Sequence, residues 1–218
     1  MDGRSPQRSD IRLLLVARGI RGFGDGFAAI VLPAYLVAIG FGTVEIGIVA
    51  AASLLGSALL TLGVGVVAPR YELRHLLIAG AVLMAATGGM LNVEDLLLIV
   101  VVAFIGTVNP SGGDVGMLVP LEQSVLARDV TDRDRTRVFA RYSLIGALCT
   151  AAGSLGASVP DFLVAHGNTM LGAFRMMFYA YAALGVFSAI LYRRVPHARA
   201  DKAPRQASRA RHSSRTSA

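Results

Sequence analysis

Residues 46–68 read IGIVAAASLLGSALLTLGVGVVA, a continuous run without one charged side chain. An α-helix needs about 20 apolar residues to cross a hydrocarbon core about 30 Å thick, because each residue adds about 1.5 Å of length. This run is therefore long enough to cross a bilayer as one helix. Further apolar segments occur on either side of it, at residues 13–39, 76–91, 96–127, 138–159 and 171–192.

The composition favours a membrane protein over a soluble domain. Hydrophobic residues make up 54% of the 218 positions and charged residues only 16%, whereas a soluble domain usually carries about 25% charge. The 24 glycines would weaken soluble helices, but glycine is common in membrane helices. We therefore predict an all-α membrane protein, a six-transmembrane-helix bundle over residues 13–192. A cytosolic segment at residues 1–12 precedes it, and a disordered basic tail at residues 193–218 follows.

The boundaries between segments rest on a few polar residues. The third segment is short and the fourth is long, so the two could also be joined into one. Asn92, Glu94 and Asp95 stand between them, and this polar cluster indicates a loop. Arg18 and Arg21 interrupt the first segment, which argues against a cleaved signal peptide. The sequence thus favours six separate spans.

The basic residues indicate how the spans are oriented. With six spans and a cytosolic start, all of the 21 lysine and arginine residues except Arg175 fall on the inner side. Cytosolic loops of membrane proteins carry such an excess, so both termini are expected in the cytosol. The net charge of +7 would then meet anionic lipid headgroups. Nucleic-acid binding is not expected, because the sequence lacks the motifs that read DNA or RNA.

No cofactor or metal is predicted from the sequence. Cys149 is the only cysteine, so an intramolecular disulfide is excluded. Lys202, in the tail, is the only lysine. A P-loop needs a lysine directly after its glycines, so that nucleotide site is excluded as well.

Ionisable side chains inside the apolar segments are candidates for function, because each costs about 2.5–3.5 kcal/mol at a helix centre. Arg18, Arg21 and Asp25 are spaced to lie on one helical face of the first segment. Asp114 and Glu122 share a face of the fourth. Depths counted from the two cytosolic ends set Asp25 level with Asp114, and Arg18 level with Glu122. We expect these charges to pair.

The loop after residues 46–68 resembles a known motif. Residues 65–74 read GVVAPRYELR, which is similar to G-x-x-x-D-R-x-G-R-R, found at this place in the major facilitator superfamily. Gly65, Arg70 and Arg74 match, and the resemblance marks them as the conformational-switch loop. Pro69 replaces the acidic residue of the motif. Residues 18–26, 120–127 and 129–143 also resemble bacterial members of that superfamily.

The resemblance implies a fold and a site. It covers residues 10–195 and corresponds to the N-terminal six-helix half of a twelve-helix transporter. In that family the first and fourth helices line the central cavity, so Asp25 and Asp114 are expected to bind a proton or solute as a pair, with Arg21 tuning their charge. Arg18 and Glu122 would form a charge cluster nearer the inner side. The alternative is a static salt-bridge cluster near the inner leaflet.

The middle of the fourth segment contains residues that interrupt helices. Asn109, Pro110, Gly112 and Gly113 lie within it, and proline and glycine kink or unwind a membrane helix. Broken helices often mark transporter binding sites, because the exposed backbone must line a cavity. A packing kink in an overlong helix is the equally weighted alternative.

Two stripes of small residues recur every four positions. They are Ser53, Ser57, Thr61 and Gly65 in the second segment, and Gly146, Thr150, Ser154 and Ser158 in the fifth. Small residues let membrane helices approach closely. The stripes are either docking surfaces for a missing half or packing surfaces inside the bundle.

Three functions follow from these features. The first is secondary transport of an unidentified small solute across a bacterial inner membrane by a half-length protein, which needs a homodimer or a separately encoded complementary half. The second is a truncated, inactive remnant of a twelve-helix transporter. The third is a membrane-embedded enzyme, which is suggested by Ser111 directly before Gly112. It is the least favoured, because the sixth segment has no histidine to activate a serine.

Overall fold

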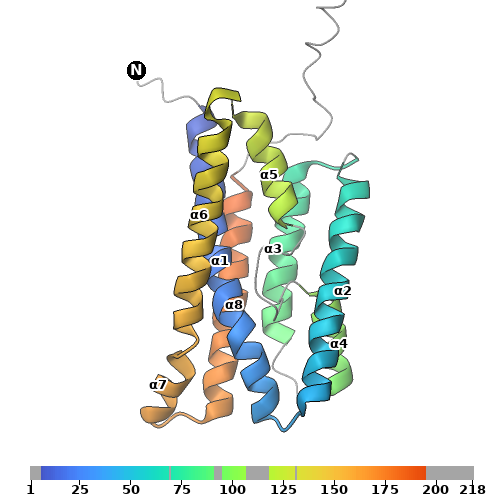
Figure 1. Cartoon of the computed structure of the whole chain (residues 1–218), viewed down its shortest axis with the longest axis vertical. Helices are drawn as coiled ribbons and strands as arrows, with labels where there is room; N and C mark the ends of the chain where they lie inside the picture. Colours follow the sequence, from blue (N-terminus) through green and yellow to red (C-terminus); the bar gives the residue numbers. More distant parts are fainter. Residues whose placement is uncertain (1–5, 69, 91–94, 107–117, 131, 195–218) are drawn as a thin grey trace, which may run out of the picture.

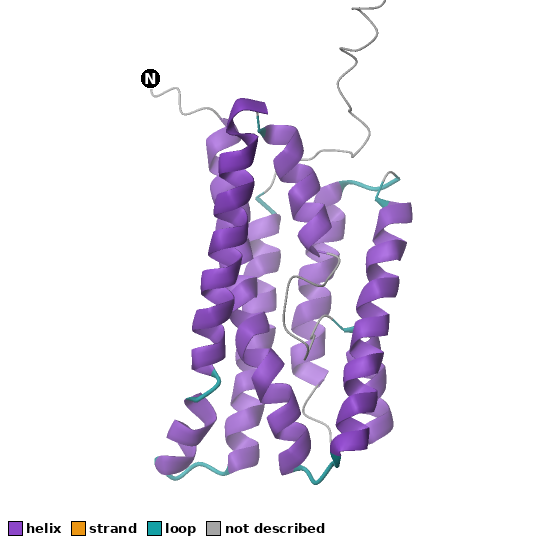
Figure 2. Ribbon diagram, viewed as in Figure 1, coloured by secondary structure: helices purple, strands orange, loops and turns teal. Residues whose placement is uncertain are grey.

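The computed structural model describes residues 6–68, 70–90, 95–106, 118–130 and 132–194. Every element in these ranges is an α-helix (Figure 2). The helices in chain order are α1 (Pro6–Ala38), α2 (Thr43–Val67), α3 (Leu73–Met90), α4 (Leu96–Ile105), α5 (Leu118–Asp129), α6 (Asp132–Gly156), α7 (Val159–Ala165) and α8 (Met170–Tyr192).

Five stretches of helix within the described residues are long and apolar enough to cross a membrane. Four of them lie in α1, α2, α3 and α8. The fifth is the segment 134–165, which contains most of α6 and all of α7. The fourth apolar segment of the sequence is instead described as two shorter apolar helices, α4 and α5. The predicted helix break at Asn109, Pro110, Gly112 and Gly113 falls between them, outside the described residues. The prediction of an all-helical membrane protein is confirmed, whereas the count of six spans stays a prediction.

The long helices run in both directions along the bundle (Figure 1). α1, α3 and α6 run away from the upper end of the view, and α2 and α8 run towards it. The described arginines at the start of α1, in the turn after α2, at the start of α6 and at the end of α8 therefore share one end of the bundle. Arg175, near the start of α8, lies at the other end. The structure thus reproduces the one-sided charge distribution that the sequence predicts.

Two helices extend further than their apolar segments. α1 begins at Pro6, and α6 begins at Asp132, six residues before the apolar segment 138–159. Charged side chains are compatible with a helix that continues beyond the hydrocarbon core. Hydropathy alone therefore underestimates the length of these two helices. Residues 195–218, most of the predicted disordered tail, lie outside the described residues.

Local signals fix several helix ends. Gly40 and Gly167 have φ values of 95° and 94°, a left-handed conformation that glycine adopts without steric cost. Both follow the end of a helix and turn the chain back. The Asp95 side chain accepts a hydrogen bond from the Leu98 amide at 2.9 Å, and Thr169 caps α8 in the same way. The predicted loop before α4 therefore ends at an N-cap.

Close approach at glycine joins the helices in pairs. A Cβ atom on Gly26 of α1 would lie 2.1 Å from the Thr150 carbonyl oxygen of α6, and one on Gly56 of α2 would lie 1.7 Å from the Phe104 carbonyl oxygen of α4. A Cβ atom on Gly185 of α8 would lie 2.6 Å from the Ala85 amide nitrogen of α3. No larger residue fits at these three crossings, so the backbones pack directly on one another.

Two apolar clusters form the interior. One contains Tyr35, Phe174 and Phe178 with neighbouring residues of α1, α4 and α8. The other contains Leu14, Leu77 and Leu121 at the end of the bundle where α1 begins. Many apolar side chains face outward instead, such as Leu62 of α2 at 68% exposed and Leu155 of α6 at 78%. A surface of this kind suits lipid or another membrane helix.

Candidate functional site

The centre of the candidate site is the buried carboxylate of Glu122 on α5, whose side chain is 0% exposed. Its Oε2 atom pairs with Arg21 Nη2 of α1 at 2.8 Å. The same oxygen accepts a hydrogen bond from the Tyr142 hydroxyl of α6, and Oε1 accepts one from the Tyr192 hydroxyl of α8. Four helices thus converge on one carboxylate, and both of its oxygens are hydrogen-bonded. We call these four residues the Glu122 cluster.

Arg18 adds a second buried cation beside the Glu122 cluster. Its side chain is 2% exposed, and its guanidinium carbon lies 5.2 Å from the centroid of the Tyr142 ring. A guanidinium over an aromatic face gains a cation–π attraction that grows when both groups are withdrawn from water. Glycine at position 146 makes room for it, because a Cβ there would lie 2.4 Å from Arg18 Nε.

Asp25 lies about one helical turn beyond Arg21 on α1, and its environment differs from that of Glu122. It is half-buried, and its Oδ1 atom accepts a hydrogen bond from the Tyr181 hydroxyl of α8 at 3.1 Å. Among the described residues this is the only hydrogen bond that Asp25 receives. Gly26, directly after it, holds α1 against α6. The backbone contact at Gly26 therefore holds this part of α1 in place, and one hydroxyl of the described residues reaches the carboxylate.

The buried face of α8 carries three polar side chains between its middle and its end. Tyr181, Ser188 and Tyr192 are separated by seven and four residues, which places them on one helical face. All three are buried. The Ser188 hydroxyl has no hydrogen-bond partner in the part of the chain that the structure describes. A polar face of α8 thus extends from Asp25 to the Glu122 cluster.

The structure brings together some of the predicted site residues. Arg18, Arg21, Asp25 and Glu122 lie in one connected region, as expected. Asp114, the predicted partner of Asp25, lies outside the described residues. The prediction that Arg18 stands level with Glu122 differs from the structure, in which Arg21 makes the ion pair. Chain ends are poor reference planes for comparing two helices, and an offset of three residues is only about 4.5 Å.

The predicted conformational-switch loop is at the basic end of the bundle. Gly65 lies in the last turn of α2, and Arg70 is exposed in the turn that follows. Arg74 lies in the first turn of α3 and is half-buried. No Cβ contact within 4 Å would arise at Gly65, so this glycine is not needed for packing in the conformation described.

The small-residue stripes pack largely inside the bundle. Ser53 donates a hydrogen bond to the Ala103 carbonyl of α4 at 3.4 Å. Ser154 donates one to the Gly26 carbonyl of α1 at 3.3 Å. Of the two interpretations left open by the sequence, internal packing therefore accounts for these parts of both stripes, whereas Gly65 and Ser158 at their ends are exposed.

Sequence reasoning missed the tyrosines. Among the described residues, Tyr142, Tyr181 and Tyr192 supply every hydroxyl that hydrogen-bonds to the two carboxylates. Tyrosine near the end of a span usually indicates an anchor at the membrane interface, so Tyr142 and Tyr192 carried no distinctive signal. The spacing of Tyr181, Ser188 and Tyr192 was the available clue. Groups of three or more residues able to hold a metal ion are absent from the described part of the chain.

Comparison with known proteins identifies the family. A model of the Major Facilitator Superfamily matches residues 14–217. The chain belongs to the major facilitator superfamily. This confirms the resemblance seen in the sequence, and the match continues past α8 into residues predicted to form a separate tail. Members of this superfamily are membrane transporters, so the chain is a multi-pass membrane protein of a transporter family.

One relative among curated proteins is an uncharacterized membrane protein of Saccharomyces cerevisiae. It is 26% identical over 177 residues, which is 79% of this chain. The chain spans about 40% of the length of that relative. The similarity therefore concerns part of a longer membrane protein, and that protein is a eukaryotic one.

Proposed function

We propose that this chain moves a small solute by secondary transport, with Asp25 as the residue that binds the solute or a coupling proton. The supporting observation is the buried polar path between α1 and α8. Tyr181, Ser188 and Tyr192 of α8 lie buried along it, from the half-buried Asp25 to the enclosed Glu122 cluster. Charges at this depth in a membrane protein are costly and usually mark a solute or ion pathway.

The two carboxylates have different roles in this proposal. Glu122 accepts hydrogen bonds on both oxygens and is closed to solvent, so it acts as a positioning residue that fixes α1 against α5, α6 and α8. Asp25 is half-buried and accepts one hydrogen bond from the described residues. Arg21 lies one helical turn from Asp25 on the same face and contributes positive charge to its surroundings. In this family the first and fourth helices line the central cavity, which supports a place for Asp25 beside the path of the solute.

The unit is proposed to work with a second half. Alternating access in this family requires two halves around a central site, and the chain spans 40% of the yeast relative. A homodimer or a separately encoded half would supply the missing wall. The basic end of the bundle is placed in the cytosol by the positive-inside rule. The bacterial inner membrane stays a prediction, since the relative described above is a yeast protein.

A ligand screen tests the role of Asp25. The purified chain is incubated with a panel of sugars, amino acids, organic acids and lipophilic cations, and thermal unfolding is recorded. We expect at least one class to raise the unfolding temperature of the wild type and not that of Asp25→Asn. Asp161→Asn is the matched control, because Asp161 is exposed outside the polar path. A stabilising ligand whose effect is equal in all three proteins contradicts the proposed site.

Uptake and assembly test the transporter itself. Proteoliposomes containing the chain are assayed with each stabilising ligand at several pH values, and the oligomeric state is measured by native mass spectrometry. A dimer with uptake supports a functional half. A protein that stays monomeric and gives no uptake favours the truncated remnant. Uptake whose pH dependence is unchanged in Asp25→Asn rejects the proton role.

A further inference from the structure

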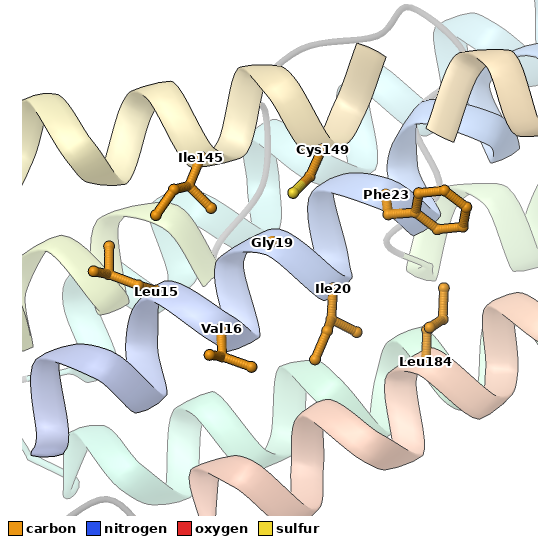
Figure 3. A pocket seen from close by; sticks show the side chains of 8 residues that line it. All are labelled: Leu15, Val16, Gly19, Ile20, Phe23, Ile145, Cys149 and Leu184. Carbon is orange, nitrogen blue, oxygen red and sulfur yellow. The ribbon is translucent and has the colours of Figure 1, made fainter. Parts of the chain in front are cut away.

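An apolar groove lies on the outer face of α1, between α6 and α8. Figure 3 shows Leu15, Val16 and Phe23 of α1 facing Ile145 of α6 and Leu184 of α8. The groove has a volume of about 470 Å³. Val16 is 50% exposed and Phe23 is 38% exposed. In a bilayer this groove is filled by apolar groups from the membrane.

Two arginines follow the same helix faces beyond one end of the groove. Arg12 precedes Val16 by four residues on α1, and Arg141 precedes Ile145 by four residues on α6, so each pair shares a face. α1 and α6 run in the same direction (Figure 1), which brings both arginines to the basic end of the bundle. Both are exposed, and neither forms an ion pair with a described residue.

Among the side chains that the structure describes at the starts of α1 and α6, positive charge prevails, with Arg12, Arg135, Arg137 and Arg141 against Asp134. The nearest described carboxylate on the same face of α6 is Asp134, seven residues before Arg141 and about 10 Å farther along the helix axis. The side chains that line the groove itself are uncharged. Its ends therefore differ: the cationic end lies towards the membrane surface, and the remainder extends into the hydrocarbon core.

We infer that this groove binds one anionic phospholipid, with an acyl chain along α1 and the phosphate between Arg12 and Arg141. Every lipid tail is equally apolar, so the groove alone cannot distinguish one phospholipid from another. The headgroup therefore determines which phospholipid binds. Basic pockets between membrane helices favour anionic headgroups, at about a fivefold gain in affinity for each arginine near the surface.

Native mass spectrometry of the full chain in detergent tests the headgroup. The protein is titrated with phosphatidylglycerol and with phosphatidylcholine that carries the same acyl chains. We expect tighter retention of phosphatidylglycerol, and a loss of about twenty-five-fold in the Arg12→Gln/Arg141→Gln variant, from two factors of about five. The control variant Arg70→Gln/Arg193→Gln removes the same charge from exposed residues at the same end. It should change affinity by less than about twofold.

The groove is tested separately from the charge. A Cβ on Gly19 would lie 3.2 Å from Cys149 Sγ and 3.4 Å from Ile145 Cγ2, so Gly19→Leu fills the groove and should release the bound lipid. Gly63→Leu is the control, because no atom lies within 4 Å of a Cβ there. The natural Cys149 gives a second readout that needs no substitution in the groove. Phosphatidylglycerol should slow its alkylation by a maleimide, while glycerol phosphate, which has no acyl chains, should not.

Four results would overturn the inference. Equal retention of the two lipids would show that the protein has no headgroup preference. An equal loss of phosphatidylglycerol affinity in the two arginine double variants would show that the attraction is general to the basic surface and not specific to Arg12 and Arg141. Protection of Cys149 by glycerol phosphate alone shows that the groove is not used. Cross-linking of Cys149 between two copies, with alkylation independent of the lipid, assigns the groove to a second chain.

Discussion

Glu122 and Asp25 are two carboxylates in one polar region, yet their surroundings are opposite. Glu122 is enclosed by four helices and has a partner on each oxygen. Asp25 is half-buried and receives one hydrogen bond, from Tyr181, among the described residues. A buried charge with all its partners is costly to disturb, because removing one partner leaves the other charge unpaired. The comparison separates a residue that holds the fold from one that is available to a ligand.

The largest expected effect comes from removing the cation of the Glu122 cluster. Arg21→Met leaves Glu122 buried without its ion pair and should lower the free energy of unfolding by about 3–5 kcal/mol. Unfolding in mixed micelles of increasing dodecyl sulfate, followed by circular dichroism, measures it. The double variant Arg21→Met/Glu122→Gln removes both charges and keeps an acceptor for the tyrosines, so it should recover more than half of the loss. A double variant no more stable than Arg21→Met would show that the ion pair is not the cause.

The hydroxyl donors should differ in the same sense. Tyr192→Phe removes a hydrogen bond to a fully buried carboxylate and should cost about 1–2 kcal/mol. Tyr181→Phe acts on the half-buried Asp25 and should cost less than Tyr192→Phe in the same unfolding assay. Tyr179→Phe, at an exposed position, is the control and should be neutral. Equal losses in Tyr192→Phe and Tyr181→Phe would remove the distinction between the two sites.

The backbone contact beside Asp25 gives a third test. Gly26→Ala places a methyl group about where the Thr150 carbonyl now lies, and such overpacking should cost about 1–3 kcal/mol. Gly63→Ala adds the same methyl group where no atom is near, and should be neutral or slightly stabilising. If Gly26→Ala is as stable as Gly63→Ala, then the contact between α1 and α6 does not hold Asp25.

The smallest effect on stability is expected at Asp25 itself. Asp25→Asn keeps an acceptor for Tyr181 and removes a charge that is only partly enclosed, so unfolding should change by less than about 1 kcal/mol. Glu122→Gln, measured in parallel, should cost more, because it leaves Arg21 buried without a counter-charge. The reverse order would exchange the roles assigned to the two carboxylates.

Much of this arrangement could be predicted from the sequence. The apolar runs identify the helices, since α8 and the predicted segment 171–192 differ by one residue at the start. Spacing placed Arg18, Arg21 and Asp25 on one face, and the cost of burying charge marked that face as important. The family resemblance rested on residues 65–74, and the match to residues 14–217 confirms it.

The partners of the charges could not be predicted in the same way. Which arginine meets Glu122 depends on how far α1 slides along α5, and this offset is set by side-chain packing rather than by where hydropathy changes. The role of Tyr192 depends on the rotation of α8, which places this residue inward although its type is common at the membrane surface. Close glycine contacts set how α1 lies on α6, at Gly26, and how α8 lies on α3, at Gly185. The sequence shows where the glycines are, but it does not show which residues of the neighbouring helices they contact.

The glycine crossings also determine which parts of the molecule can shift as units. α1 with α6, α2 with α4, and α3 with α8 each meet backbone to backbone, so sliding either member of a pair along the other would force main-chain atoms together. Motion of low energetic cost must therefore occur between the pairs. Of these, α2 with α4 is tied least to the rest, because its packing is mainly internal. We therefore expect α2 and α4 to move together as one unit relative to the other helices. Their amide hydrogens should then exchange with solvent faster than those of α1 or α8.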